Sequence, residues 1–116
     1  MTVIRSKEVE ADLSTPGRSG LAMVGAAIGA KSLRVGISTF QPGVRIPLHI
    51  HDAEEAIVII DGEASCRVGD EYFTLHPNDT VHVPAGTQHH FWNDSQAPFT
   101  FVAIYPANEV KRTVVE

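Results

Sequence analysis

Three histidines and one glutamate in this sequence have a spacing that suits metal ligation. His49 and His51 are two residues apart, so on a β-strand both imidazoles point to the same face. Glu55 follows after a short loop that lets the chain place its carboxylate beside them. His89 comes after a Pro-Ala-Gly turn that begins at Pro84, and a different strand would bring it in as the fourth ligand. Neutral imidazoles with one carboxylate suit a divalent transition metal ion (Fe, Mn, Ni, Zn or Cu) and leave open coordination positions.

The other histidines have different expected roles. His82 lies in an apolar run before the fourth ligand, and two roles stay open: a core or interface histidine, or a general acid/base in a cavity, since its near-neutral pKa suits proton transfer. His90 should point away from its neighbour on a strand, toward the surface. His76 precedes a proline at a turn and is expected to be solvated. Glu54 is the alternative carboxylate ligand, but the spacing favours Glu55 and leaves Glu54 facing solvent.

Short β-type segments must position these side chains. Runs rich in Val, Ile, Thr, Phe and Tyr lie between closely spaced Gly, Pro, Asn and Asp turn signals, at residues 33–40, 56–60, 64–68, 71–75, 80–83 and 99–105. No stretch keeps a helical period over three turns. Many short strands at this spacing predict an all-β sandwich or barrel.

One turn predicts which strands it connects. Residues 57–60 and 63–68 are both strand-like, and the dipeptide Asp61-Gly62 joins them. Asp-Gly is a favoured two-residue turn, so we predict that these two strands form a hairpin.

Length and composition exclude several classes of protein. The 116 residues are 43% hydrophobic and 20% charged, which predicts one globular domain. The net charge of −5 argues against a nucleic-acid binder. A single cysteine, Cys66, excludes an internal disulfide and a CxxC site, and is expected to be a small buried residue. The uncharged stretch 21–30 is too short to span a bilayer and follows acidic residues, so we expect no membrane segment, no signal peptide and a cytoplasmic protein.

Two blocks of the sequence resemble the paired motifs of the cupin superfamily. The first motif, G(X)5HXH(X)3–4E(X)6G, is matched in full by Gly43, His49, His51, Glu55 and Gly62. The second, G(X)5PXG(X)2H(X)3N, is matched by Pro84, Gly86, His89 and Asn93. Asn78 stands where the family usually has glycine. We expect a left-handed backbone there, because Asn tolerates that conformation best after glycine.

This resemblance implies an architecture. It implies that residues 1–116 form a single cupin domain with its core at about 33–105, built as a double-stranded β-helix, or jelly-roll barrel, with the metal inside. It also implies a homodimer. The first dozen residues and residues 110–116 look like arms that add edge strands or pair with a second subunit.

Several functions fit such a barrel, since one fold hosts many chemistries. We expect first a metal-dependent dioxygenase acting on a small organic molecule; a metal-dependent lyase or isomerase, or a non-catalytic module that binds a sugar or metabolite, are the alternatives. Two roles stay open for Arg45: binding an acidic substrate, or lying on the surface. Isoleucine three residues before His49 argues against an oxalate-type substrate. The expected pocket residues are Ile46, Ile57, Ile59, Phe91 and Tyr105.

Overall fold

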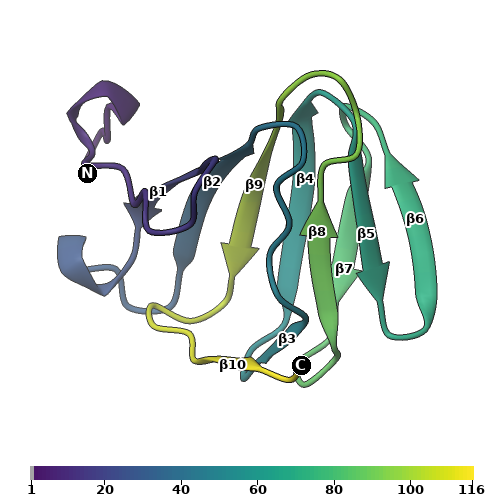
Figure 1. The fold of residues 1–116 in the computed structure, drawn as a ribbon. Coiled ribbons are helices and arrows are strands. Elements are labelled where there is room, and N and C mark those ends of the chain that lie inside the picture. The colour runs from purple at the N-terminus through teal and green to yellow at the C-terminus, as the bar shows by residue number, and fades with distance from the viewer. Residues whose placement is uncertain (1) are drawn as a thin grey trace.

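The protein folds as two facing antiparallel sheets (Figure 1). The computed structural model describes residues 2–116, and these contain ten strands in two five-stranded sheets. In spatial order, the first sheet consists of β1 (Arg18–Val24), β2 (Arg34–Phe40), β9 (Phe99–Tyr105), β4 (Glu55–Asp61) and β7 (Thr80–Val83). The second sheet consists of β10 (Arg112–Val114), β3 (His49–His51), β8 (His89–Trp92), β5 (Ala64–Val68) and β6 (Glu71–Leu75). The predicted all-β jelly roll is confirmed.

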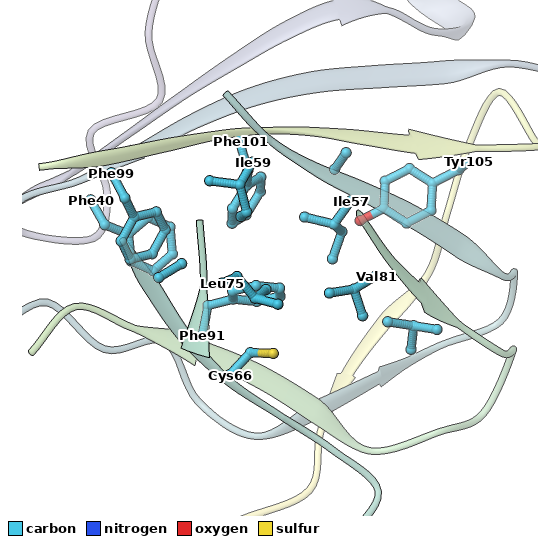
Figure 2. Close-up of a cluster of buried hydrophobic side chains, with 13 residues drawn as sticks. Phe40, Ile57, Ile59, Cys66, Leu75, Val81, Phe91, Phe99, Phe101 and Tyr105 are labelled. Carbon is cyan, nitrogen blue, oxygen red and sulfur yellow. The ribbon is translucent and has the colours of Figure 1, made fainter. Parts of the chain in front are cut away.

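Strict alternation along the central strands builds the core. In β4 and β9, every second side chain points between the sheets, and these are apolar residues such as Ile57, Ile59 and Phe101. Phe40 and Phe99 stack with their ring centroids 4.6 Å apart. Figure 2 shows this aromatic pair at one end of the cluster and Tyr105 at the other. Burying each of these large side chains contributes about 1.5–3 kcal/mol to folding. The end of the barrel that holds Phe40 and Phe99, the packed end, therefore contributes much of its stability.

The chain crosses between the sheets at the Asp61-Gly62 turn, and the predicted hairpin there is wrong. Strand β4 pairs with β7 and β9, whereas β5 pairs with β6 and β8 in the other sheet. Gly62 has φ 79°, and a Cβ at this position would collide with the carbonyl of Pro98 and the backbone of Phe99. Turn chemistry predicts that the chain bends here, but the pairing partners come from strands distant in sequence.

The backbone at Asn78 confirms an expectation from the sequence. Asn78 has φ 77° and is the one non-glycine residue with a positive φ in residues 2–116. Its N–H donates to the carbonyl of Ile59 at 2.7 Å, which ties the turn before β7 to β4. Asparagine can therefore replace glycine without changing the turn.

Strand β1 is the element that the sequence pattern did not predict. Gly20 and Ala22 dilute its β-propensity, and its register with β2 shifts between Ala22 and Val24. The amino-terminal arm contacts β1 through a bridge between Asp12 and Gly20, and the carboxyl-terminal arm adds β10 to the edge at β3. No helix within residues 2–116 has the length and apolar character that crossing a bilayer requires.

Candidate metal centre

Three histidines meet inside the barrel. His49 and His51 on β3 and His89 on the neighbouring β8 place their candidate ligand atoms within 4.8 Å of one another. His49 and His89 are directly paired across the two strands, which explains how residues forty positions apart come into contact. His49 and His89 are 4% and 2% exposed, so the cluster faces the interior.

Glu55 joins this cluster from the opposite sheet. It is the first residue of β4 and is 4% exposed. Its Oε1 lies 3.1 Å from Nε2 of His89 and 3.8 Å from Nε2 of His51. The four side chains that the motif spacing predicted as ligands are therefore brought together at one place.

Backbone carbonyls orient two of the imidazoles. Nδ1 of His49 donates to the carbonyl of Pro47 at 2.7 Å, and Nδ1 of His89 donates to the carbonyl of Thr87 at 2.8 Å. Because a carbonyl only accepts, the ring proton lies on Nδ1 and the lone pair of Nε2 faces the cluster. Metal-binding histidines commonly have such an outer hydrogen bond. His51 lacks one among residues 2–116, and its Nδ1 is buried.

The contact between His89 and Glu55 is the strongest evidence that this site fits a cation. With its proton on Nδ1, His89 presents a lone pair to a carboxylate oxygen only 3.1 Å away. Either a proton on Nε2 or a metal ion shared by the two atoms makes this contact favourable. Atoms that share one metal ion through bonds of about 2.1 Å are roughly 3.0–3.5 Å apart. The donor set therefore fits a divalent transition metal ion, which His49, His51 and His89 could hold, with Glu55 beside them.

Burial keeps these imidazoles in the form that binds metal. Desolvation lowers the pKa of His49 from 6.5 to about 4, and the nearby positive charge that His89 and Arg112 would contribute lowers it further. Desolvation also lowers the pKa of His51, although the carboxylate of Glu55 opposes this shift. Both rings are therefore neutral at pH 7, and little proton competition stands against metal binding.

The cluster opens into a cavity of about 300 Å³. The predicted pocket residues Ile46, Ile57, Phe91 and Tyr105 line it. Ile59 does not: it is fully buried in the core cluster, two residues further along β4 toward the packed end. The hydroxyl of Tyr105 lies 3.4 Å from Nε2 of His51. Burial raises the pKa of Tyr105, as does the nearby carboxylate of Glu55, so its hydroxyl stays protonated.

His82 lies outside this cavity and outside the core, so neither of these two expected positions is found, and a role at an interface stays a prediction. Strand β7 alternates with Val81 and Val83 inward, which turns His82 to the outer face. Its Nε2 lies 2.9 Å from Oε1 of Glu54, and both side chains are more than 60% exposed. Glu54 therefore faces solvent, as expected from the sequence.

The structure also gives the exposure of three further residues for which the sequence suggested a position. His76 is exposed, as expected. His90 was expected at the surface but is 7% exposed, and its Nδ1 donates to the carbonyl of Ile46 at 3.1 Å. The segment before β3 runs alongside β8 and covers His90, which no local pattern indicates. Arg45 pairs with Glu116 at 2.7 Å on the surface and does not line the cavity.

Sequence reasoning missed the arginines of the cavity. Arg18, Arg34 and Arg112 line it together with the histidine cluster. Arg18 alternates with Gly20 and Ala22 on β1, so recognising that strand would have placed all three side chains on one face. The strand itself was not recognised, and the arginine remained unnoticed.

Comparison with known proteins identifies the family to which this architecture corresponds. A family model described as Cupin domain matches residues 36–105, more than half of the chain. Auxin-binding protein T92 of Nicotiana tabacum is 31% identical over 94 residues, which cover 69% of this chain and 50% of that protein. Quercetin 2,3-dioxygenase of Bacillus subtilis is 36% identical over 50 residues, which cover 42% of this chain and 15% of that protein. The chain thus spans about half the length of the auxin-binding protein, and much less of the dioxygenase.

Solved structures agree with this fold. The polyketide cyclase RemF from Streptomyces resistomycificus superposes with a TM-score of 0.84 at 17% identity, over 100% of this chain and 87% of that one. Bacillus subtilis oxalate decarboxylase, in a structure concerned with its Mn(II) centres, superposes with a TM-score of 0.85 at 21% identity, over 96% of this chain and 31% of that one. At these identities the likeness shows the fold alone.

Proposed function

This chain belongs to the cupin domain family, and we propose that it is a metal-dependent oxidoreductase of the dioxygenase type, which oxidises a small organic molecule inside the barrel. The observation that carries this proposal is the contact between His89 and Glu55. It places an imidazole nitrogen and a carboxylate oxygen 3.1 Å apart in a buried cluster that opens into a cavity. A divalent transition metal bound there would act as a Lewis acid and, as Fe(II), support reaction with dioxygen.

The residues of this chain would hold and orient both the metal and the substrate. The neutral rings of His49 and His51 and the carboxylate of Glu55 give a ligand set with low net charge. Apolar walls at Ile57 and Phe91 exclude water and bind the apolar part of a substrate. The hydroxyl of Tyr105, kept protonated by burial, is placed to donate a hydrogen bond to a substrate oxygen.

The scarcity of proton-transfer groups favours oxidation over lyase or isomerase chemistry. With His82 on the outer face, the titratable side chains that line the cavity outside the ligand cluster are Tyr105, Asp12 and the three arginines, among residues 2–116. Asp12 is exposed and accepts a hydrogen bond from the backbone of Ser14. Lyase and isomerase reactions need a general base near the substrate, whereas oxidation relies mainly on the metal. The match to a segment of quercetin 2,3-dioxygenase adds support.

A non-catalytic role in binding a small molecule is the second candidate. Several auxin-binding proteins match this chain over longer stretches than the dioxygenase does. A cavity with apolar walls and few proton-transfer groups would suit capture without turnover as well.

Anaerobic purification followed by metal analysis and oxygen-uptake measurement tests the proposal. The Fe(II)-loaded protein should contain about one metal ion per chain and should consume dioxygen with at least one member of a panel of small aromatic and aliphatic substrates. Failure to bind a stoichiometric transition metal would refute the metalloenzyme proposal. Tight metal and ligand binding without turnover across the panel would favour the binding module.

We also propose that the protein is a cytoplasmic homodimer. Leu33, just before β2, and Ile104 on β9 are exposed and line one surface hollow, so they form an apolar surface that a second copy would cover. Light scattering after size-exclusion chromatography should then report twice the monomer mass of 12.6 kDa.

A further inference from the structure

Arg18 is a partly buried cation that lines the cavity and makes no salt bridge within residues 2–116, although the charge of Asp12 acts on it from a greater distance. Its guanidinium lines the same cavity as the histidine cluster, and its Nη2 donates to Oγ of Ser38 at 2.9 Å. Its Nε is buried and has no hydrogen-bond partner, and no carboxylate within residues 2–116 lies within 4 Å of the guanidinium. Removing a charge from water without pairing it is costly, so a ligand that supplies the negative charge would be strongly favoured.

The neighbouring strands hold the guanidinium in place and leave space in front of it. On the inner face Arg18 is registered with Phe40, and Gly20 with Ser38. The guanidinium carbon lies 5.9 Å from the ring centroid of Phe40, within the range of a cation–π contact. A Cβ on Gly20 would lie 3.4 Å from both terminal nitrogens, so the guanidinium passes directly over this glycine. The next inward pair, Ala22 and Gly36, is also small.

The charge around Arg18 is predominantly positive. Arg34 and Arg112 line the same cavity. Burial lowers the pKa of Arg18, the charge of Asp12 opposes this shift, and the charge of Arg112 adds to it to a smaller extent. An arginine still stays protonated at neutral pH. Neither carboxylate of the cavity lining pairs directly with Arg18: Asp12 acts on it from beyond salt-bridge distance and accepts a hydrogen bond from Ser14, and Glu55 lies among the candidate metal ligands. Binding of a divalent ion would make the cavity more positive still.

We propose that Arg18, oriented by Ser38, is the subsite for the carboxylate of a small organic acid whose apolar body contacts Ile46, Ile57 and Phe91. Within the protein the guanidinium uses one of its five N–H donors, and two parallel N–H groups match the two oxygens of a planar carboxylate. A cavity of about 300 Å³ with apolar walls holds a small ring or short chain beside that group. This inference rests on the proposed function, because it names the substrate class of the same cavity.

Benzoate and benzamide are a matched pair of probes, since they have the same ring and nearly the same size but differ in charge. Binding of each is measured calorimetrically to the metal-free protein, so that a carboxylate bound by the metal does not contribute. Wild-type protein should bind benzoate at least tenfold more tightly than benzamide. Arg18→Gln should remove about tenfold or more of the benzoate affinity, as expected for a charge-assisted pair, and leave benzamide binding unchanged.

Three variants control for folding and for net charge. Arg45→Gln removes the same charge from the surface and should leave benzoate binding at the wild-type level. Arg18→Lys keeps the charge but loses the planar fork, and Ser38→Ala loses the orienting hydroxyl. Both should weaken benzoate binding severalfold, and they provide the test if Arg18→Gln does not fold, as judged by its thermal unfolding.

Several results would overturn the proposal. They are an undetectable affinity of wild-type protein for benzoate, equal benzoate affinity in the folded Arg18 variants, or inorganic phosphate binding more tightly than benzoate in an Arg18-dependent way. Metal content is measured separately on the same preparations. A protein that binds metal in both wild-type and Arg18→Gln forms but shows no Arg18-dependent benzoate binding refutes this inference alone. A protein without metal that retains Arg18-dependent benzoate binding refutes the proposed enzyme alone.

Discussion

The two chemical groups of the cavity are assembled in different ways. The histidine cluster comes from two adjacent strands, and backbone carbonyls two residues away orient His49 and His89. Arg18 instead depends on the next strand along the chain, because Ser38 and Phe40 of the paired strand β2 position its guanidinium. A ligand cluster held by local bonds keeps a recognisable spacing in sequence. Arg18 belongs to no such motif, although its partner Ser38 is only 20 residues away in the chain.

The largest expected effect lies in the histidine cluster. His49→Ala should lower metal affinity by at least about 100-fold, because it removes a ligand, whereas loss of an outer hydrogen bond alone costs about 10–100-fold. Metal analysis after dialysis against a weak chelator measures this loss. The exposed His76→Ala is the matched control and should retain full metal content. Retention of metal by both variants would show that His49 is not a ligand.

Titration should also distinguish the histidine cluster from the arginine. The folded pKa of His49 is about 4, below its ordinary value of 6.5, so between these values the unfolded chain binds a proton that the folded chain excludes. The free energy of unfolding of the metal-free protein should therefore fall as pH drops from 6.5 toward 4, by up to about 1.4 kcal/mol per pH unit from this residue. Urea denaturation at pH 7 and pH 5 measures the fall.

The control for this titration is His49→Gln, which should have a shallower loss of stability over the same range. Arg18→Gln should keep the wild-type slope, because an arginine does not titrate there. An unfolding free energy that is flat from pH 7 to pH 5 would contradict the buried neutral state of His49.

Filling the space beside Arg18 should separate ligand binding from metal binding. Gly20→Val adds a side chain directly below the guanidinium and should lower benzoate affinity about tenfold, in proportion to a lost charge-assisted contact. Its metal content should stay at the wild-type level. Ser19→Val, on the other face of β1, is the matched control and should change neither. Equal loss of benzoate binding in both variants would mean that β1 as a whole, rather than the cavity, is disturbed.

The smallest effect is expected outside the barrel. The pair formed by His82 and Glu54 is solvent-exposed, and such pairs contribute about 0–1 kcal/mol. His82→Gln should therefore leave metal content, benzoate affinity and oxygen uptake unchanged, and thermal unfolding should shift by no more than a few degrees. A large loss of oxygen uptake would contradict this prediction and would make His82 a candidate general acid/base again.

Much of the barrel follows from local patterns. The runs 64–68, 71–75, 80–83 and 99–105 coincide with β5, β6, β7 and β9, because alternating apolar residues between turn signals are strand-like in any context. The positive φ of Asn78 also follows from residue type. Pairing does not: the Asp61-Gly62 turn looks like a hairpin, yet its strands belong to different sheets.

The sequence by itself predicted which side chains gather at the candidate metal centre: two-residue alternation on β3 puts His49 and His51 on one face, and the spacing of the two motifs names Glu55 and His89. The tertiary structure brings Glu55 and His89 to them, from the opposite sheet and from the paired strand β8. Only the tertiary structure decided that His82 faces out, that His90 is buried and that Arg18 enters the cavity. Each of these depends on which face of a strand the other sheet covers. That choice is made by contacts between residues far apart in the chain, and no local spacing records it.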